Sequence, residues 1–307
     1  DPGFCFAKGL YHRFTNNSRE ALKELNQARL PRDNPWAQKA TAAMIETYIM
    51  PDNENLWEDQ EDRGEVEDNI ATAEKLLRDV QSEEKAALLE AYCLVASKRK
   101  DSLERALSKF YDMMSATENN LGGSASAKGG DDGDNASPSA SSTAEKINVP
   151  ALVGMATTLQ IMKQTPKARN HLKRVAKANY NPEEDEDYER GWLLLADIYI
   201  QNGKYDLAQE LLKRAIQAKS CCRAWEYMGV IFEKEQAYKD AADCYENAWK
   251  LVNESDPAIG FKLAFNFLKA RKLVQAIDIC QKVLKAHPNY PKIRKDVLER
   301  ARQMLKP

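Results

Sequence analysis

The stretch that decides the fold is residues 192–215, WLLLADIYIQNGKYDLAQELLKRA. It holds two apolar helical patterns on either side of Asn202-Gly203, a dipeptide that ends helices because glycine accepts a left-handed backbone. A small residue stands at one point in each pattern, Ala196 in the first and Ala208 in the second. Two antiparallel helices approach closely only where side chains are small, so the stretch predicts a helical hairpin that crosses at these alanines.

The same pattern returns twice toward the C-terminus. Ala241 follows Ala208 after 33 residues, and Ala276 follows after 35 more. The small residues at the structural repeat positions are Ala196, Ala208, Gly229, Ala241, Ala264 and Ala276. A period of about 34 residues with small residues at two fixed points is the signature of the tetratricopeptide repeat. The sequence therefore predicts an all-α solenoid, a right-handed superhelix of about seven antiparallel helix pairs with a C-terminal capping helix.

Composition along the chain divides it into repeats, an insertion and a cap. The predicted regions are helical repeats over 1–116, a flexible insertion over 117–147, helical repeats over 148–290 (clearest at 189–290), and a capping helix over 291–307. We expect about three helix pairs before the insertion and about four after it. The acidic stretch Asp52 to Asp68 is too long for the usual turn, so it predicts an insertion within the first repeats. The Gly, Ser and Asp-rich stretch cannot bury enough apolar surface to become ordered.

Composition also bounds the chemistry. The net charge of −2 over 307 residues gives no global attraction to nucleic acid, and no apolar run is long enough to span a membrane. Six cysteines without framework spacing predict free thiols in a reducing, intracellular setting. We find no nucleotide-binding, nucleophile or metal-ligand motif, so no catalytic residue, cofactor or metal is expected, and the chain is not predicted to be an enzyme. The apolar helical face of Phe4, Phe6 and Leu10 leads us to expect a further segment upstream.

A basic stretch near the middle of the chain allows two interpretations. Its cations are Lys163, Lys167, Arg169, Lys173, Arg174 and Lys177. They could contact RNA or a phosphoinositide, or they could simply form a solvated helix face. No aromatic residues lie between them for base stacking, which favours the solvated face.

The concave groove of the solenoid is the candidate binding surface, since the first helix of each pair lines it. The residues predicted to line the groove are Arg190, Asp197, Arg223, Glu226, Val230, Phe261 and Phe265. The Lys and Asn pattern of chaperone-binding repeats, which grips a C-terminal carboxylate, is not reproduced over consecutive units. Phe261 and Phe265 are unexpectedly apolar for such a surface. Either the C-terminal cap covers them, or a partner helix or peptide docks there.

Residues between the repeat positions carry a more specific resemblance. They are residues 225–229 (WEYMG), 233–238 (EKEQAY), 260–266 (GFKLAFN) and 286–296 (AHPNYPKIRKD). Together these stretches closely resemble the C-terminal end of the large tetratricopeptide-repeat subunit of intraflagellar transport complex A, in the tetratricopeptide repeat protein 21 family. The resemblance is specific over about residues 188–307.

This resemblance implies a protein–protein interaction scaffold that supports retrograde transport and the trafficking of ciliary membrane proteins. The implied partners are other subunits of complex A and cargo adaptors in a hetero-oligomeric assembly, with no nucleic acid and no direct membrane insertion. The implied location is the cytoplasm, the cilium or flagellum, and the basal body. A tetratricopeptide-repeat adaptor of another intracellular multiprotein assembly is the alternative.

Overall fold

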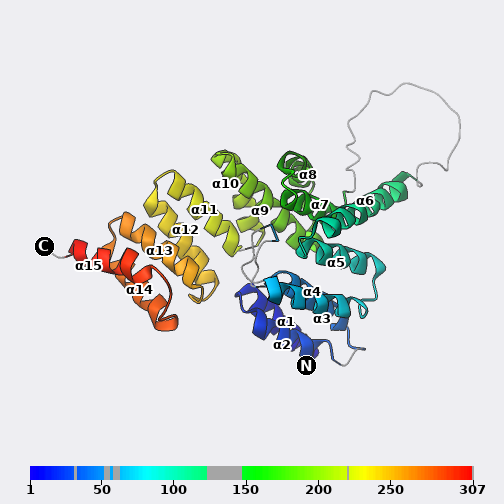
Figure 1. Cartoon of the computed structure of the whole chain (residues 1–307), viewed down its shortest axis with the longest axis horizontal. Coiled ribbons are helices and arrows are strands. Elements are labelled where there is room, and N and C mark those ends of the chain that lie inside the picture. Colours follow the sequence, from blue (N-terminus) through cyan, green and yellow to red (C-terminus); the bar gives the residue numbers. More distant parts are fainter. Residues whose placement is uncertain (31–32, 52–55, 58–62, 123–146, 220, 306–307) are drawn as a thin grey trace, which may run out of the picture. The chain divides into compact units, whose positions relative to one another are not determined.

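The structure, a computed structural model, describes residues 1–30, 33–51, 56–57, 63–122, 147–219 and 221–305 (Figure 1). The α-helices are α1 Pro2–Phe14, α2 Ser18–Ala28, α3 Ala37–Ile49, α4 Arg63–Leu77, α5 Glu83–Ala96, α6 Lys100–Gly122, α7 Val149–Ile161, α8 Thr165–Lys177, α9 Asp185–Gln201, α10 Tyr205–Ala218, α11 Cys222–Lys234, α12 Tyr238–Leu251, α13 Pro257–Lys269, α14 Leu273–Ala286 and α15 Glu299–Leu305. A short 3-10 helix, η2 Pro182–Glu184, precedes α9, and a π-helical turn, η3 Ile293–Leu298, precedes α15. No strand occurs among the described residues, so the predicted all-α repeat fold is confirmed.

The chain divides into two compact units, which we describe separately. Unit 1 combines residues 1–54 with residues 192–307, and unit 2 comprises residues 55–191. The division falls inside the sequence of α9, between Gly191 and Trp192.

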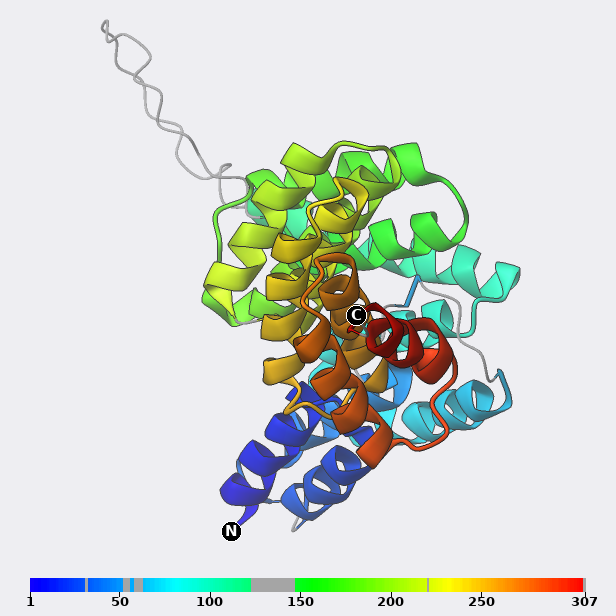
Figure 2. The ribbon, with the colours of Figure 1, turned by 90° about the vertical axis from the view of Figure 1, so that its left-hand side faces the viewer.

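In unit 1 the helices from α11 to α14 pack in chain order, each against the next (Figures 1 and 2). The small residues predicted at the helix crossings are all buried in this packing. The largest side chains at the centre are Tyr245 and Trp249 of α12, which are 0% and 2% exposed. Short-range contacts between consecutive helices therefore build the core, as expected of a repeat solenoid.

Gly229 lies at a helix crossing and makes room there for the ring of Tyr245. A Cβ atom at Gly229 would lie only 2.7 Å from the ring of Tyr245, which is too close for real atoms. The α9–α10 and α13–α14 pairs carry alanine at the same register position, with Leu212 and Cys280 as the corresponding second-helix residues. The α1–α2 pair has glycine, since a Cβ atom at Gly9 would lie 2.7 Å from Leu25. The close approach of the Tyr245 ring thus requires glycine at position 229.

The turns within the helix pairs share a backbone conformation. Asn16, Lys163, Gln236 and Arg271 have positive φ values between 55° and 61°, and Gly203 has 69°. Each is followed by a residue whose N–H bonds back to a carbonyl five positions earlier, as in the bond from Ala237 to Phe232. This left-handed helix end satisfies carbonyls that the helix leaves free. Glycine was a visible signal at only one of these five turns.

In unit 2 the helices α4 to α8 pack consecutively around Phe110 and Tyr92, whose rings meet edge to face at 5.6 Å. Gly154 of α7 lets Phe110 approach closely, because a Cβ atom there would lie 2.3 Å from the ring. Ala168, Leu172 and Val175 of α8 are at most 1% exposed.

Two helix boundaries differ from the predicted ones. Helix α6 continues to Gly122, six residues into the predicted insertion, because no glycine or proline interrupts it earlier. The rest of the predicted insertion, residues 123–146, lies outside the described residues. Helix α4 begins at Arg63, inside the acidic stretch 52–68.

The predicted single capping helix is a π-helical turn followed by the short helix α15. Ile293, Val297, Leu298 and Ala301 are buried, whereas Leu305 near the end of α15 is 47% exposed. The wider π turn stacks residues four and five apart, which explains how Ile293, Val297 and Leu298 all face the core.

No disulfide joins any of the six cysteines, all of which lie among the described residues, and most of them are deeply buried. Burial raises the pKa of Cys93, Cys244 and Cys280 to about 12. The pKa of Cys222 rises to about 12 through burial and through the nearby carboxylate of Glu226. These thiols stay protonated at neutral pH and act as small packing residues.

Candidate functional site

The predicted groove residues fall on the first helices of successive pairs. Arg190 belongs to unit 2, where it pairs with Glu186 and Asp187 of its own helix α9. The other six belong to unit 1, with Asp197 on α9, Arg223, Glu226 and Val230 on α11, and Phe261 and Phe265 on α13. Their role in binding stays a prediction.

An ion-pair cluster joins α11 to α13. One carboxylate oxygen of Glu226 lies 3.0 Å from the ammonium of Lys262, and the other lies 3.5 Å from the guanidinium of Arg223. The Glu226 side chain is only 6% exposed, whereas Lys262 is 39% and Arg223 is 27% exposed. Two cations therefore share one buried carboxylate, and each cation keeps part of its side chain exposed.

A second polar contact lies one to two turns further along the same two helices. The Asn266 amide nitrogen donates to a carboxylate oxygen of Glu233 and to the backbone carbonyl of Lys262. Asn266 is 0% exposed, and its side-chain oxygen has no partner among the described residues. The prediction omitted Lys262, Glu233 and Asn266. Their spacing gave a signal, since Glu226 and Glu233 are seven apart and Lys262 and Asn266 four apart, each on one helix face.

Aromatic residues border this polar cluster. The rings of Phe261 and Phe265 stack at 6.3 Å, and the ring of Tyr290 lies 6.3 Å from Phe261. Tyr290 comes from the loop between α14 and η3, and burial raises its pKa. The ammonium of Lys269 lies 5.3 Å from the centre of the Phe265 ring. Both phenylalanines are half-buried against the core, so an aromatic surface with cationic edges remains accessible.

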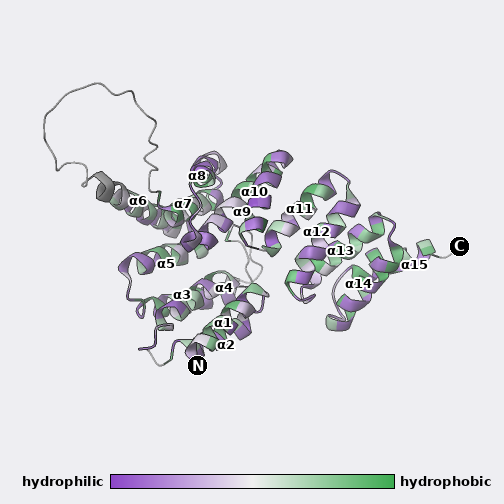
Figure 3. Ribbon diagram, turned by 180° about the vertical axis from the view of Figure 1, so that it is seen from behind, coloured by the Kyte–Doolittle hydropathy of each residue, from purple (hydrophilic) through white to green (hydrophobic). Residues whose placement is uncertain are grey.

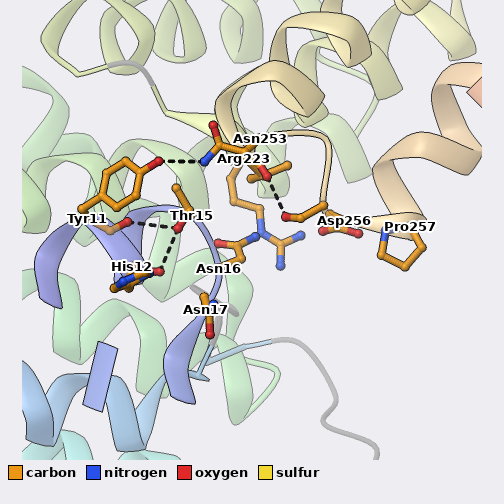
Figure 4. A pocket seen from close by; sticks show the side chains of 11 residues that line it. Tyr11, His12, Thr15, Asn16, Asn17, Arg223, Asn253, Asp256 and Pro257 are labelled. Carbon is orange, nitrogen blue, oxygen red and sulfur yellow. Dashed lines mark hydrogen bonds between the residues drawn. The ribbon is translucent and has the colours of Figure 1, made fainter. Parts of the chain in front are cut away.

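A polar pocket of about 600 Å³ in unit 1 shares Arg223 with the ion-pair cluster (Figure 4). Its lining residues are Tyr11, His12, Thr15, Asn16, Asn17, Arg223, Val252, Asn253, Ser255, Asp256 and Pro257. The amide of Asn253 donates to the Tyr11 hydroxyl at 3.0 Å, and the Arg223 guanidinium lies between Asn16 and Asp256. Sequence reasoning missed this pocket, because its walls come from turns far apart in the chain.

No cluster of histidine, cysteine, aspartate and glutamate side chains suited to a metal ion occurs in the described part of the chain. Among the same residues, no helix is both long and apolar enough to cross a membrane. The described side chains at the predicted groove positions are charged or aromatic, apart from Val230.

Comparison with known proteins places the chain in a family. Residues 72–302 match the tetratricopeptide repeat protein 21 C-terminal ARM domain, and residues 1–49 match the fifth ARM repeats domain of the same proteins. The chain is 46% identical to tetratricopeptide repeat protein 21B of Mus musculus and of Homo sapiens, over 100% of its own length and 22% of theirs. It is 44% identical to tetratricopeptide repeat protein 21A of Mus musculus, with the same coverage.

A solved structure supports the fold alone. The chain is similar to the crystal structure of the APC/C hetero-tetramer Cut9–Hcn1, with a TM-score of 0.54 and 14% identity, over 95% of this chain and 47% of that one. The family models cover most of the chain, and the chain spans 22% of the length of its curated relatives. The chain therefore belongs to the tetratricopeptide repeat protein 21 family.

Proposed function

We propose that the chain is a non-catalytic protein-interaction scaffold, the C-terminal repeat segment of an intraflagellar transport complex A subunit. The observation that carries the scaffold role is the shared carboxylate of Glu226, which holds Arg223 and Lys262 on one accessible surface next to Phe261 and Phe265. Arginine and aromatic residues at a surface are typical of protein interfaces. Family membership and repeat architecture support the same role.

The proposed setting is the cilium, with retrograde transport and membrane-protein trafficking as the process. The proposed partners are other complex A subunits and cargo adaptors, held in a hetero-oligomer. The C-terminal stretches 225–229, 233–238, 260–266 and 286–296 support this assignment through their resemblance to the complex A subunit. A repeat adaptor in another intracellular assembly remains the second candidate, which the fold supports equally.

The test is purification of the tagged full-length protein from ciliated cells that lack their own copy. We expect other complex A subunits to be recovered in stoichiometric amounts. Recovery of chaperones or ubiquitin-ligase subunits in their place would identify the second candidate as correct.

A groove variant locates the contact. We would combine Lys262→Glu with Phe265→Ala, and compare it with Leu207→Ala plus Lys213→Glu on α10, where both residues are exposed. We expect at least one partner to be lost only from the groove variant. Equal recovery with both variants would show that the groove does not bind the partners of this complex.

A further inference from the structure

Helix α8 of unit 2 differs from the other helices in its charge. From Val149 to Pro182 the sequence contains no aspartate or glutamate. The same span contains six cations, Lys163, Lys167, Arg169, Lys173, Arg174 and Lys177. Figure 3 shows purple, hydrophilic residues on α8. All the charged residues that are exposed on this helix are basic.

The cations occupy one side of the helix because the other side is committed to the core. Ala168, Leu172 and Val175 are buried at i, i+4 and i+7. Lys167, Asn170, Lys173, Arg174 and Lys177 are exposed, and Lys163 is exposed in the turn before the helix. At about 1.5 Å per residue, the thirteen residues of α8 make a basic row about 20 Å long and one helix wide.

These six cations have no ion-pair partner among the described residues. Other second helices pair their charges, as Arg214 does with Glu210 at 2.6 Å on α10, and Lys250 with Glu246 at 2.7 Å on α12. Within unit 2, Lys109 of α6 pairs with Glu90 at 2.7 Å. The helix dipole favours cations in the last turn, which accounts for Arg174 and Lys177 but leaves the others uncompensated.

The surroundings restrict the kind of anion that fits. No large apolar side chain is exposed between the cations, so the row itself offers nothing to insert into a bilayer or to stack on bases. Tyr180, which follows the row, is 43% exposed, but its hydroxyl donates to Asp185 at 2.7 Å. The basic row is one helix wide, which suits a narrow ligand that follows α8.

We propose that the exposed face of α8 is a docking surface for an extended acidic segment of a partner protein. An extended chain advances about 3.3 Å per residue, so about six residues match the length of the basic row. The row carries enough unpaired cations to contact alternate carboxylates of such a segment. The α8 surface belongs to unit 2 and the groove residues of α11 and α13 belong to unit 1, so the inference does not depend on the groove.

The test uses the full chain and fluorescein-labelled hexaglutamate as the probe, with binding followed by fluorescence anisotropy at low and high salt. The α8 variant combines Lys167→Glu, Lys173→Glu and Lys177→Glu. The control combines Lys213→Glu, Lys239→Glu and Lys285→Glu, three exposed lysines of unit 1. Both variants change the net charge equally, and circular dichroism checks that both fold.

We expect the probe to bind the unmodified chain in a salt-sensitive manner, and the α8 variant to lose affinity about tenfold or more while the control loses much less. An equal loss of probe affinity in both variants would show that binding depends only on the net charge of the chain, and this would overturn the proposal. Two further arms use phosphatidylserine vesicles and a single-stranded RNA oligomer. Tighter, α8-dependent binding of either one would identify a membrane or an RNA as the ligand and also overturn it.

Discussion

Helices α8 and α12 are both the second helix of their repeats, but their exposed charges differ: those of α12 include an ion pair, and those of α8 are all positive. Both bury residues at i, i+4 and i+7, namely Ala168, Leu172 and Val175 in α8 and Ala241, Tyr245 and Ala248 in α12. On its exposed side α12 pairs Lys250 with Glu246, whereas α8 has no acidic residue at all. The buried side thus specifies the fold, and the exposed side is free to specify a ligand.

The largest expected effect comes from the buried side. Gly229→Val would push a branched side chain into the ring of Tyr245, which is fully buried and cannot move aside. We expect a loss of about 2–3 kcal/mol in the free energy of unfolding, measured with urea. The control is Ala258→Val at an exposed position of α13, with a change below about 0.5 kcal/mol. Similar losses from both would mean that the crossing is not closely packed.

A smaller difference in stability is expected between the loss of a half-buried ion pair and the loss of an exposed one. Lys262→Ala leaves the buried Glu226 with Arg223 alone, and we expect a loss of about 1 kcal/mol, kept modest because Lys262 is 39% exposed. Lys250→Ala removes the exposed partner of Glu246, and the expected loss is below about 0.5 kcal/mol. Thermal unfolding of the two variants side by side gives the difference, and an equal cost would show that burial of Glu226 contributes nothing.

A substitution can introduce an acidic residue into α8, which has none. Asn170→Glu places a carboxylate four residues before Arg174 and three before Lys173, an arrangement that stabilises a helix by about 0.3–0.5 kcal/mol. We expect unit 2 to become slightly more stable and the hexaglutamate probe to bind more weakly. Asn170→Gln is the matched neutral control. Unchanged probe affinity in the glutamate variant would argue against ligand contact along this face.

The smallest effect is a pH dependence at His171. Burial, followed by the neighbouring charge of Arg174, lowers the pKa of His171 in the folded state. The unfolded chain therefore binds the proton more readily, so the stabilising contribution is complete above about pH 6.5 and is lost as the pH falls through the unfolded and then the folded pKa. His171→Gln should flatten this part of the stability profile. The histidine C–H resonances in NMR give the pKa directly, and an upward shift would contradict the prediction.

Sequence reasoning predicted the repeat positions because packing itself dictates them. Small residues at a period near 34 are needed wherever two helices cross, so Ala208, Ala241 and Ala276 were visible without any structure. The helix ends were harder to predict. Lys163, Gln236 and Arg271 adopt the left-handed conformation there, and these residue types, unlike glycine, do not indicate it in a sequence.

The candidate surfaces could be predicted only in part. The groove positions on α11 and α13 followed from the repeat register, but the pairing of Glu226 with Lys262 depends on how adjacent helices are offset. The cations of α8 could be counted in the sequence. The lack of an acidic partner for them among the described residues depends on the tertiary structure, as does the contact between Tyr11 and Asn253.

The buried cysteines make the chain its own reporter of unfolding. Cys93 lies in unit 2, whereas Cys244 and Cys280 lie in unit 1, and their protonated, enclosed thiols react with an alkylating reagent only after the surrounding helices open. Cys5 is half-exposed and would react first, as an internal reference. Pulsed alkylation followed by peptide mass spectrometry can therefore time the opening of each unit in the unmodified protein. Simultaneous modification of all three buried thiols would mean that the two units unfold as one cooperative body.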